Sequence, residues 1–262
     1  MKSPKHIHII GICGVATSAL AIAFKDKGWK VTGSDKGFFP PVSTELEKHK
    51  IPFYAGWHPE NIGKPDLVIM GASGTSQSNP EVLYVKKNDL LLISFAEALG
   101  KYIVKENSIV TVGTWGKTTN SALLSYILIQ AKFNPSYFTG GVSLSHKTGV
   151  ISDSKWSVVE GDEYKVSISD ERPKFVYYKP THLILTAISW DHADLYPTEK
   201  SYFDVFKKLI SKTKFIVANR DNKKVKELVK KAIWYGKENA DYVYTNVIQT
   251  KDGLDFKING IK

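Results

Sequence analysis

The sequence predicts an α/β protein made of two successive units, each a parallel sheet with helices on its faces. Two observations predict this fold class. Short apolar, β-branched runs alternate with longer helical patterns along most of the chain, which is typical of parallel sheets. A strand, a glycine turn and a helix also follow one another twice, first after residue 6 and again after residue 107. The second occurrence marks the start of a new βα unit.

The first unit, which we place at residues 1–104, begins with an isoleucine-rich strand at His6–Ile10 that ends in a glycine turn. A helix at Ala16–Lys27 and a strand at Trp29–Gly33 follow. Their order predicts a Rossmann-like domain. The remaining predicted elements are strands at Leu67–Met70 and Leu90–Ile93 and helices at Ser43–His49 and Pro80–Lys87.

The second unit, residues 105–262, begins with the β-branched run Ile109–Val112, a glycine turn and a helix at Thr118–Ala131. Further strands are predicted at Trp156–Glu160, Leu183–Ile188, Phe215–Ala218 and Tyr242–Tyr244, with a helix at Tyr202–Lys212. This order again indicates a parallel sheet with helices on its faces.

The end of the chain predicts a β-hairpin. Asp252-Gly253 separates the alternating runs Val247–Lys251 and Leu254–Ile258, and this dipeptide is a strong hairpin turn. Asn259-Gly260 would turn the chain once more. Because another strand is expected where the sequence stops, we interpret the second unit as incomplete.

The formal charge of +10 does not indicate nucleic-acid binding. Only Arg172 and Arg220 are arginines, so nearly all of the positive charge is lysine, without the clustered arginines and stacking aromatics of nucleic-acid grooves. A mildly positive cleft suits small polyanions such as nucleotides better. We therefore expect no nucleic-acid partner.

The single cysteine, Cys13, excludes an internal disulfide and fits a reducing compartment. The apolar stretch at Ile7–Phe24 is interrupted by glycines, Thr17 and Ser18, so it is too broken to span a membrane. We expect a cytoplasmic protein without membrane insertion.

The strongest motif is the run from Ile109 to Thr119. A strand enters a glycine turn whose backbone N–H groups can surround phosphate oxygens, and the following helix adds its positive N-terminal end. Lys117 can reach the outer phosphates, and the Thr118 hydroxyl can bind Mg²⁺. The first glycine of the longer Walker pattern falls at Thr111, so only the shorter form is present. The phosphate-binding residues are predicted to be Gly113, Thr114, Trp115, Gly116, Lys117, Thr118 and Thr119.

Two polar clusters follow strands of the same unit. The acidic run Glu160-Gly161-Asp162-Glu163 lies at the end of one strand, where P-loop enzymes hold Mg²⁺ against a nucleotide. His192, flanked by Asp191 and Asp194, follows another strand. There it is a candidate ligand of a second metal ion, with Asp191 able to orient its ring.

A second glycine loop lies at Gly11-Ile12-Cys13-Gly14-Val15-Ala16, followed after the next strand by Ser34-Asp35. Glycines at this place let a phosphate approach the backbone, and the polar pair falls where a ribose or base would lie. The pattern is only partly that of dinucleotide-binding proteins, because Cys13 occupies the middle glycine position. An NAD-dependent oxidoreductase is thus a weaker alternative, which leaves the P-loop unexplained.

These motifs, in this order, resemble the Mur ligase family, and the likeness extends over the whole chain. The segments Glu160–Tyr164, Arg172–Pro180 and Asp191–Asp194 look more like the muropeptide-recycling ligases than like the UDP-N-acetylmuramate:L-alanine ligases. The resemblance implies ATP-dependent formation of an amide bond between the carboxylate of UDP-N-acetylmuramate and the amine of an amino acid or muropeptide, through an acyl phosphate.

The resemblance also assigns the sites. Lys117, Glu160 and His192 would be catalytic, with Mg²⁺ as the cofactor and ATP as a co-substrate. Thr118 and Glu160 would hold one Mg²⁺ ion and His192 the other. Lys207 falls where some members carry a carbamylated lysine, but we interpret it as an ordinary exposed lysine. The UDP-sugar would contact Gly11, Cys13, Gly14, Val15, Ser34 and Asp35.

Three departures from the family pattern leave an alternative open. Trp115 replaces the usual His or Asn of the P-loop, and Ala187 stands where an Asn commonly precedes the Asp-His pair. The rest of the central domain and the C-terminal ligase domain are missing, so we expect that this polypeptide alone cannot complete the ligation. The alternative is a non-catalytic binding module for UDP-sugar or nucleotide.

Overall fold

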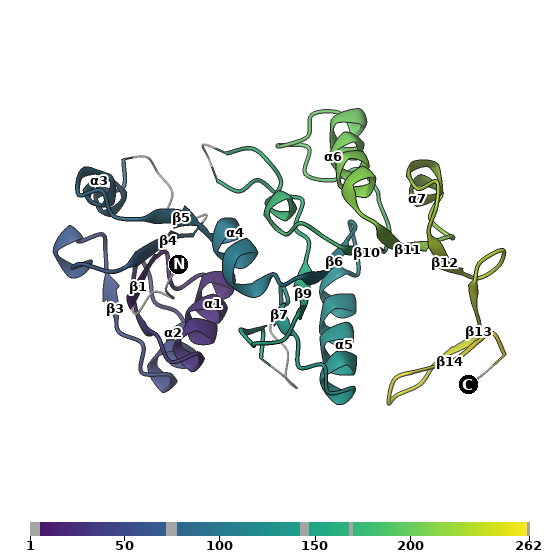
Figure 1. Ribbon diagram of the computed structural model, residues 1–262, viewed down its shortest axis with the longest axis horizontal. Helices are drawn as coiled ribbons and strands as arrows, with labels where there is room; N and C mark the ends of the chain where they lie inside the picture. Colours follow the sequence, from purple (N-terminus) through teal and green to yellow (C-terminus); the bar gives the residue numbers. More distant parts are fainter. Residues whose placement is uncertain (1–5, 72–77, 142–146, 168–169, 261–262) are drawn as a thin grey trace.

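The computed structural model describes residues 6–71, 78–141, 147–167 and 170–260. They form two sheets that follow one another along the long axis of the molecule (Figure 1). The predicted α/β class is confirmed. Within the described ranges, no helix is both long enough and apolar enough to cross a membrane.

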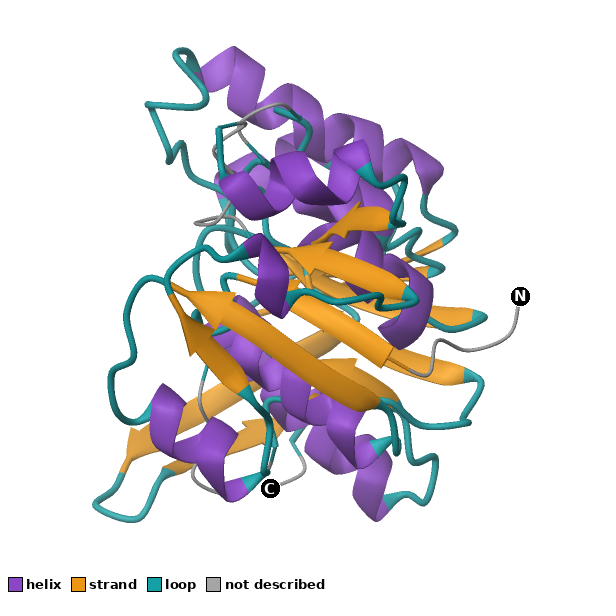
Figure 2. Ribbon diagram, turned by 90° about the vertical axis from the view of Figure 1, so that its left-hand side faces the viewer, coloured by secondary structure: helices purple, strands orange, loops and turns teal. Residues whose placement is uncertain are grey.

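The first sheet is parallel throughout, with the order β3-β2-β1-β4-β5. Its central strand β1 (His6–Ile10) alternates between two buried faces, so that Ile7 and Ile9 face one helical layer and Ile10 faces the other. Figure 2 views this unit from its outer side and shows helices on both faces of the strands. The other strands are β2 (Lys30–Asp35), β3 (Phe53–Ala55), β4 (Leu67–Met70) and β5 (Leu92–Ser94).

The helices of this unit are α1 (Val15–Asp26), α2 (Val42–Lys48) and α3 (Pro80–Lys87). Leu20, Phe24 and Leu46 bring α1 and α2 onto the face of Ile7 and Ile9. Val82 and Val85 place α3 against the opposite face. Burial of both faces explains why β4 is a continuous apolar run, while β1 buries His8 among its isoleucines.

A tight linker joins the two units. The capped helix α4 (Phe95–Ala98) continues into a π-helical turn at Leu99–Ile103. Gly100 of this turn packs against the second unit so closely that an added Cβ would lie 2.5 Å from the backbone oxygen of Tyr177. The linker therefore has no room for a side chain at this position.

The second sheet has the order β14-β13-β12-β11-β10-β6-β9-β7-β8. Its centre is β6 (Asn107–Val112), paired in parallel with β9 (Trp156–Glu160) and β10 (His182–Leu185). The other strands are β7 (Ser136–Phe138), β8 (Gly149–Val150), β11 (Phe215–Asn219), β12 (Ile233–Gly236), β13 (Tyr242–Gln249) and β14 (Leu254–Ile258). Figure 1 shows α5 (Lys117–Gln130) on one face and α6 (Glu199–Lys212) and α7 (Lys223–Leu228) on the other.

The predicted hairpin is confirmed, but two predicted strands differ from the structure in their extent. The strand predicted at Tyr242–Tyr244 and the first hairpin arm form one strand, β13, whose pairing with β14 shifts in register between Thr245 and Ile248. β10 ends at Leu185 and does not continue to Ile188. After Leu185 the chain turns to carry the polar residues of the site.

Candidate functional site

The phosphate loop connects the carboxyl end of β6 to α5. Gly113 and Gly116 both have positive φ angles, 138° and 79°, which favour glycine. An added Cβ on Gly113 would lie 2.7 Å from the oxygen of Ala187. The loop thus passes so close to the segment after β10 that only glycine fits.

Hydrogen bonds fix the loop against that segment. The Thr114 amide donates to the oxygen of Ala187 at 2.6 Å, and its hydroxyl donates to the oxygen of Ser189 at 2.8 Å. The Thr186 hydroxyl donates to the oxygen of Trp115 at 2.5 Å, whose side chain stays exposed. These bonds hold the loop in place without using the amides at the start of α5.

The first turn of α5 is ready to bind an anion. Gly116 is its N-cap and provides no side-chain cap. Among the described residues, none accepts a hydrogen bond from the amides of Lys117, Thr118 or Thr119. Unpaired first-turn amides, together with the helix dipole, form a phosphate-binding site.

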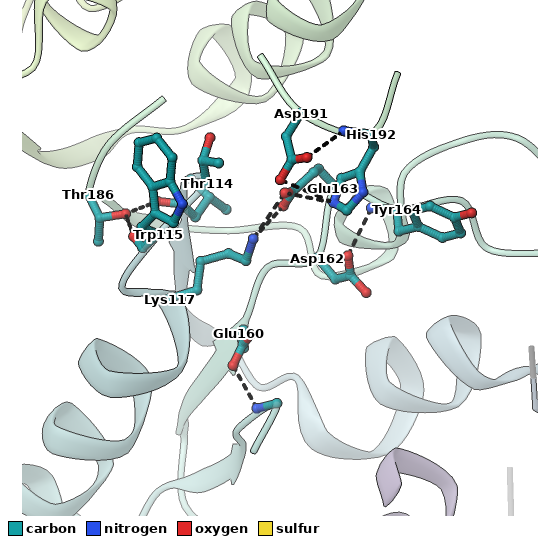
Figure 3. A network of polar contacts seen from close by, with 12 residues as sticks. Thr114, Trp115, Lys117, Glu160, Asp162, Glu163, Tyr164, Thr186, Asp191 and His192 are labelled. Atoms are coloured by element: carbon teal, nitrogen blue, oxygen red, sulfur yellow. Dashed lines mark hydrogen bonds and ion pairs between the residues drawn. The ribbon is translucent and has the colours of Figure 1, made fainter. Parts of the chain in front are cut away.

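Lys117 is held beside this turn by Glu163 (Figure 3). Its Nζ lies 3.0 and 2.9 Å from the two carboxylate oxygens of Glu163, whose side chain is fully buried. The Tyr202 hydroxyl donates to the same carboxylate at 3.3 Å. Burial raises the pKa of the Glu163 carboxyl, and the charge of Lys117 opposes that shift.

Glu160 ends β9 on the other side of Lys117 in Figure 3. Its Oε2 accepts a hydrogen bond from the amide of Gly140 at 2.6 Å. An added Cβ on Gly140 would lie against the Glu160 carboxylate, and one on Gly141 would lie 3.0 Å from the methyl of Thr118. Because neither glycine has a Cβ, this short segment can lie against both Thr118 and Glu160, and the two side chains are close to it on the same side of the site.

His192 follows β10 with a positive φ angle of 54°. Its amide donates to Asp191 Oδ1 at 2.7 Å, while its ring Nε2 lies 3.5 Å from Glu163 and 3.9 Å from Asp191 Oδ2. The ring packs edge-on against Tyr164 at a centroid distance of 5.2 Å. The carboxylate nearest to the ring is thus that of Glu163, a residue the sequence analysis did not select.

The donor atoms suit Mg²⁺ bound together with a nucleotide. Among the described residues, no three His, Cys, Asp or Glu side chains form a cluster that could hold a metal ion alone. Mg²⁺ at nucleotide sites takes only one or two carboxylates and completes its shell with phosphate oxygens and water. Thr118 with Glu160 fits one such position. His192 lies apart from Glu160 (Figure 3), and its role as a ligand of a second ion stays a prediction.

A second ion pair lies in the same loop. Lys174 Nζ is 2.6 Å from Asp162 Oδ2. Burial tends to raise the pKa of the Asp162 carboxyl, but Lys174 holds it below its ordinary value. Lys207, by contrast, is exposed and lies 3.4 Å from Asp204, as expected for an ordinary surface lysine.

The glycine loop of the first unit uses most of its own amides. The Gly11 and Ile12 amides both donate to the oxygen of Ser34, and the Cys13 amide donates to Asp35 Oδ2 at 2.8 Å. Burial and the charge of Asp35 raise the pKa of the Cys13 thiol to about 12. Because these amides are engaged, any free donors must come from the helix that follows.

The start of α1 supplies those donors. Gly14 is the N-cap and has no side-chain cap. Within the described part of the chain, the amides of Val15, Ala16 and Thr17 have no acceptor. An added Cβ on Gly14 would lie 2.9 Å from the Thr17 hydroxyl. This turn has the same arrangement of unpaired amides as the start of α5, and such an arrangement suits a phosphate.

Ser34 has a structural partner that the sequence did not reveal. Its side chain is fully buried, and its hydroxyl donates to Glu81 Oε2 at 2.5 Å. Burial raises the pKa of Glu81, whose other oxygen accepts from the amide of His58 at 3.0 Å. Ser34 therefore supports the glycine loop through its backbone oxygen, while its hydroxyl is bound to Glu81. Its contact with a UDP-sugar stays a prediction.

Comparison with protein families covers both units. Residues 6–106 match the model described as "Mur ligase family, catalytic domain", and residues 110–262 match the "Mur ligase middle domain". The chain is 36% identical, over 200 residues, to the UDP-N-acetylmuramate--L-alanyl-gamma-D-glutamyl-meso-2,6-diaminoheptandioate ligase of Haemophilus influenzae, covering 75% of this chain and 44% of that protein. It is 31% identical, over 259 residues, to the UDP-N-acetylmuramate--L-alanine ligase of Clostridium acetobutylicum. This match covers 95% of this chain and 55% of that protein.

Solved structures agree with these matches. A UDP-N-acetylmuramate:L-alanyl-gamma-D-glutamyl-meso-diaminopimelate ligase from Neisseria meningitides superimposes with a TM-score of 0.85 at 27% identity, over 99% of this chain and 86% of that one. A murein peptide ligase from Psychrobacter arcticus gives a TM-score of 0.79 at 25% identity, and the match covers 98% of this chain and 59% of that chain. This chain spans about half the length of the curated relatives it matches.

Proposed function

The chain belongs to the Mur ligase family, and from this premise we propose that it carries the two nucleotide sites of an ATP-dependent amide-bond ligase. The ligase would join the carboxylate of UDP-N-acetylmuramate to the amine of an amino acid or peptide. The observation that carries the proposal is the turn at the start of α5. Its unpaired amides lie beside Lys117 and Glu160, as transfer of a phosphoryl group from ATP requires.

The proposed reaction has two steps. A carboxylate oxygen of the muramate attacks the γ-phosphorus of ATP, the bond to the bridging oxygen of ADP breaks, and an acyl phosphate forms. The amine then attacks the acyl carbon, phosphate leaves with the bonding electrons, and the nitrogen loses a proton. Negative charge spreads over the phosphoryl oxygens in the first step, where the ammonium of Lys117 and the first-turn amides stabilise it.

We assign Mg²⁺ to the residues that fit it. Thr118 and Glu160 would hold one ion and His192 a second. When bound, the metal neutralises phosphate charge and polarises the phosphoryl oxygens. The chain itself fixes the positions of these three side chains through Gly140, Gly141 and the turn at His192.

We further propose that the amine belongs to the peptide L-alanyl-γ-D-glutamyl-meso-diaminopimelate rather than to L-alanine. Identity to the Haemophilus ligase named for that peptide, 36%, exceeds the 31% to the L-alanine ligase of Clostridium acetobutylicum. The segments at Glu160–Tyr164 and Asp191–Asp194, which carry the resemblance, lie together in the site.

A non-catalytic binding module remains the second candidate. It is favoured by the exposed Trp115 in the phosphate loop and by the engagement of Lys117 with a buried carboxylate. Such a module would bind the UDP-sugar and ATP without releasing ADP. The family assignment removes the NAD-dependent oxidoreductase from consideration.

The UDP-sugar site can be tested at α1. A glutamate in place of the half-exposed Val15 would put a negative charge among the free amides, so Val15→Glu should weaken binding of UDP-N-acetylmuramate at least tenfold by calorimetry. Leu83→Glu, at an equally exposed position in the first turn of α3, is the matched control and should leave the affinity unchanged. Equal effects of the two variants would remove α1 from the binding site.

A further inference from the structure

Glu163 contacts three separate parts of the second unit. Its carboxylate lies 2.9 Å from Lys117 of α5, 3.3 Å from the hydroxyl of Tyr202 of α6 and 3.5 Å from the ring of His192 after β10. Its backbone oxygen accepts a hydrogen bond from the Tyr196 hydroxyl at 2.5 Å. Glu163 thus lies between the phosphate-loop lysine and the histidine.

Tyr202 extends this network to the loop itself. Its hydroxyl lies 3.2 Å from the Thr114 hydroxyl, and the Thr114 hydroxyl also accepts from the Ser189 amide at 2.9 Å. The polar path therefore runs from the phosphate loop through Tyr202 to Glu163 and back to Lys117. Figure 3 shows Lys117 and His192 on either side of the Glu163 carboxylate.

The burial of Glu163 decides what Lys117 can do. A fully buried carboxylate that loses its cation is left as an uncompensated buried charge, which is unfavourable. Lys117 therefore cannot move away to a phosphate without leaving that charge unpaired. An ammonium has three N–H donors, so it can stay on Glu163 and still present a donor to a phosphate at the start of α5.

We propose that Glu163 is a positioning residue that keeps the ammonium of Lys117 beside the phosphate site and that the pair persists when ATP binds. This inference rests on the proposed function, because it requires that the site bind ATP. The opposite arrangement would be a latch, in which Glu163 competes with the nucleotide for Lys117 and releases it when ATP arrives.

The affinity test compares two isosteric substitutions in one loop. Glu163→Gln should weaken binding of ATP with Mg²⁺ about tenfold by calorimetry, because a charge-assisted contact that holds Lys117 is lost. Asp162→Asn is the control, since Asp162 pairs with Lys174 and not with Lys117, and it should change the affinity less than about twofold. Unchanged or tighter binding by Glu163→Gln would overturn the proposal, and tighter binding would establish the latch.

A spectroscopic readout separates positioning from general damage. In the wild-type chain labelled with ¹⁵N-lysine, the ammonium signal of Lys117, assigned by its absence from Lys117→Met, should be visible without ligand and remain visible with saturating ATP and Mg²⁺. Glu163→Gln should lose this signal while still binding UDP-N-acetylmuramate like wild type. Loss of the wild-type signal on adding ATP, or its survival in Glu163→Gln, would contradict the proposal.

The two failures can be told apart. If the wild-type chain does not bind ATP at all, the proposed function fails. If it binds ATP with Lys117 contributing, but Glu163→Gln and Asp162→Asn behave alike, only the role of Glu163 is refuted.

Discussion

His8, at the centre of β1, is buried where a proton would be costly. Its Nδ1 lies 2.9 Å from the Thr32 hydroxyl, and its Nε2 has no partner in the described part of the chain. Burial, with His6 nearby, lowers the pKa of His8 to about 4. In the unfolded chain, the His8 ring therefore binds a proton near pH 6.5, whereas in the folded chain it binds this proton only near pH 4.

This difference predicts a pH-dependent stability. Because the unfolded state binds more protons between pH 6.5 and 4, the contribution of His8 to stability falls as the pH falls through this window, by about 3 kcal/mol in total. Urea unfolding of wild type and His8→Asn at several pH values measures it, and the variant should lose less stability on acidification. His58→Asn, at an exposed histidine, is the control. Parallel pH profiles for wild type and His8→Asn would show that His8 does not contribute.

At the residue scale, the sequence motifs identified residues that lie close together in the structure, but they did not predict every contact among them. The spacing of the P-loop placed Lys117, and the acidic run after β9 was correctly expected near it. The pattern of that run did not show which acid points inward, because all three follow a strand and only packing decides that Glu163 is buried. The Ser34–Glu81 contact was equally hidden, since it joins residues 47 positions apart.

At the scale of elements, the π-helical linker gives a sharp prediction. Gly100→Ala would place a methyl group 2.5 Å from the backbone oxygen of Tyr177, which belongs to the second unit. Overpacking of this kind costs about 1–3 kcal/mol, and urea denaturation should show a loss of that size. Lys101→Ala, an exposed neighbour in the same turn, should change stability by less than about 0.5 kcal/mol. Equal stability of the two variants would mean that the linker has more space than the structure shows.

The predicted elements were most accurate where strands are central and buried on both faces. β1, β4 and β9 lie at their predicted residues because each is a short run rich in apolar residues that is followed directly by a glycine. The short strands β3, β7, β8 and β12 and the helix α7 were not predicted. The residues of these four strands take an extended conformation through pairing with neighbouring strands, which no local pattern encodes.

For the whole molecule, one buried core spans both sheets. The same cluster contains Ile7 and Ile9 of the first sheet and Val110 and Val112 of the second. Phe95 packs edge-on against Phe138 across the junction, with ring centroids 5.5 Å apart. The ion pairs Lys27–Asp153 and Asp26–Lys147 lie at its exposed rim, where they contribute little.

A shared core predicts a single cooperative unfolding transition. Hydrogen exchange measured by mass spectrometry across a urea series should show peptides of β1 and β6 losing protection at the same midpoint. Phe138→Ala should lower both midpoints together, with a loss of about 3–5 kcal/mol. Two separate midpoints, or a Phe138→Ala effect confined to β6, would show that the units fold independently.

The central claim is that the turn from Gly113 to Thr119 binds the phosphates of ATP, and the most direct test is calorimetric titration of the chain with ATP and Mg²⁺. Wild type should bind, and Lys117→Ala should lose at least tenfold in affinity while it still binds UDP-N-acetylmuramate. Lys174→Ala, which removes the neighbouring carboxylate-paired lysine, should bind ATP like wild type. Absence of wild-type binding at millimolar ATP, or equal affinities for wild type and Lys117→Ala, would contradict the claim.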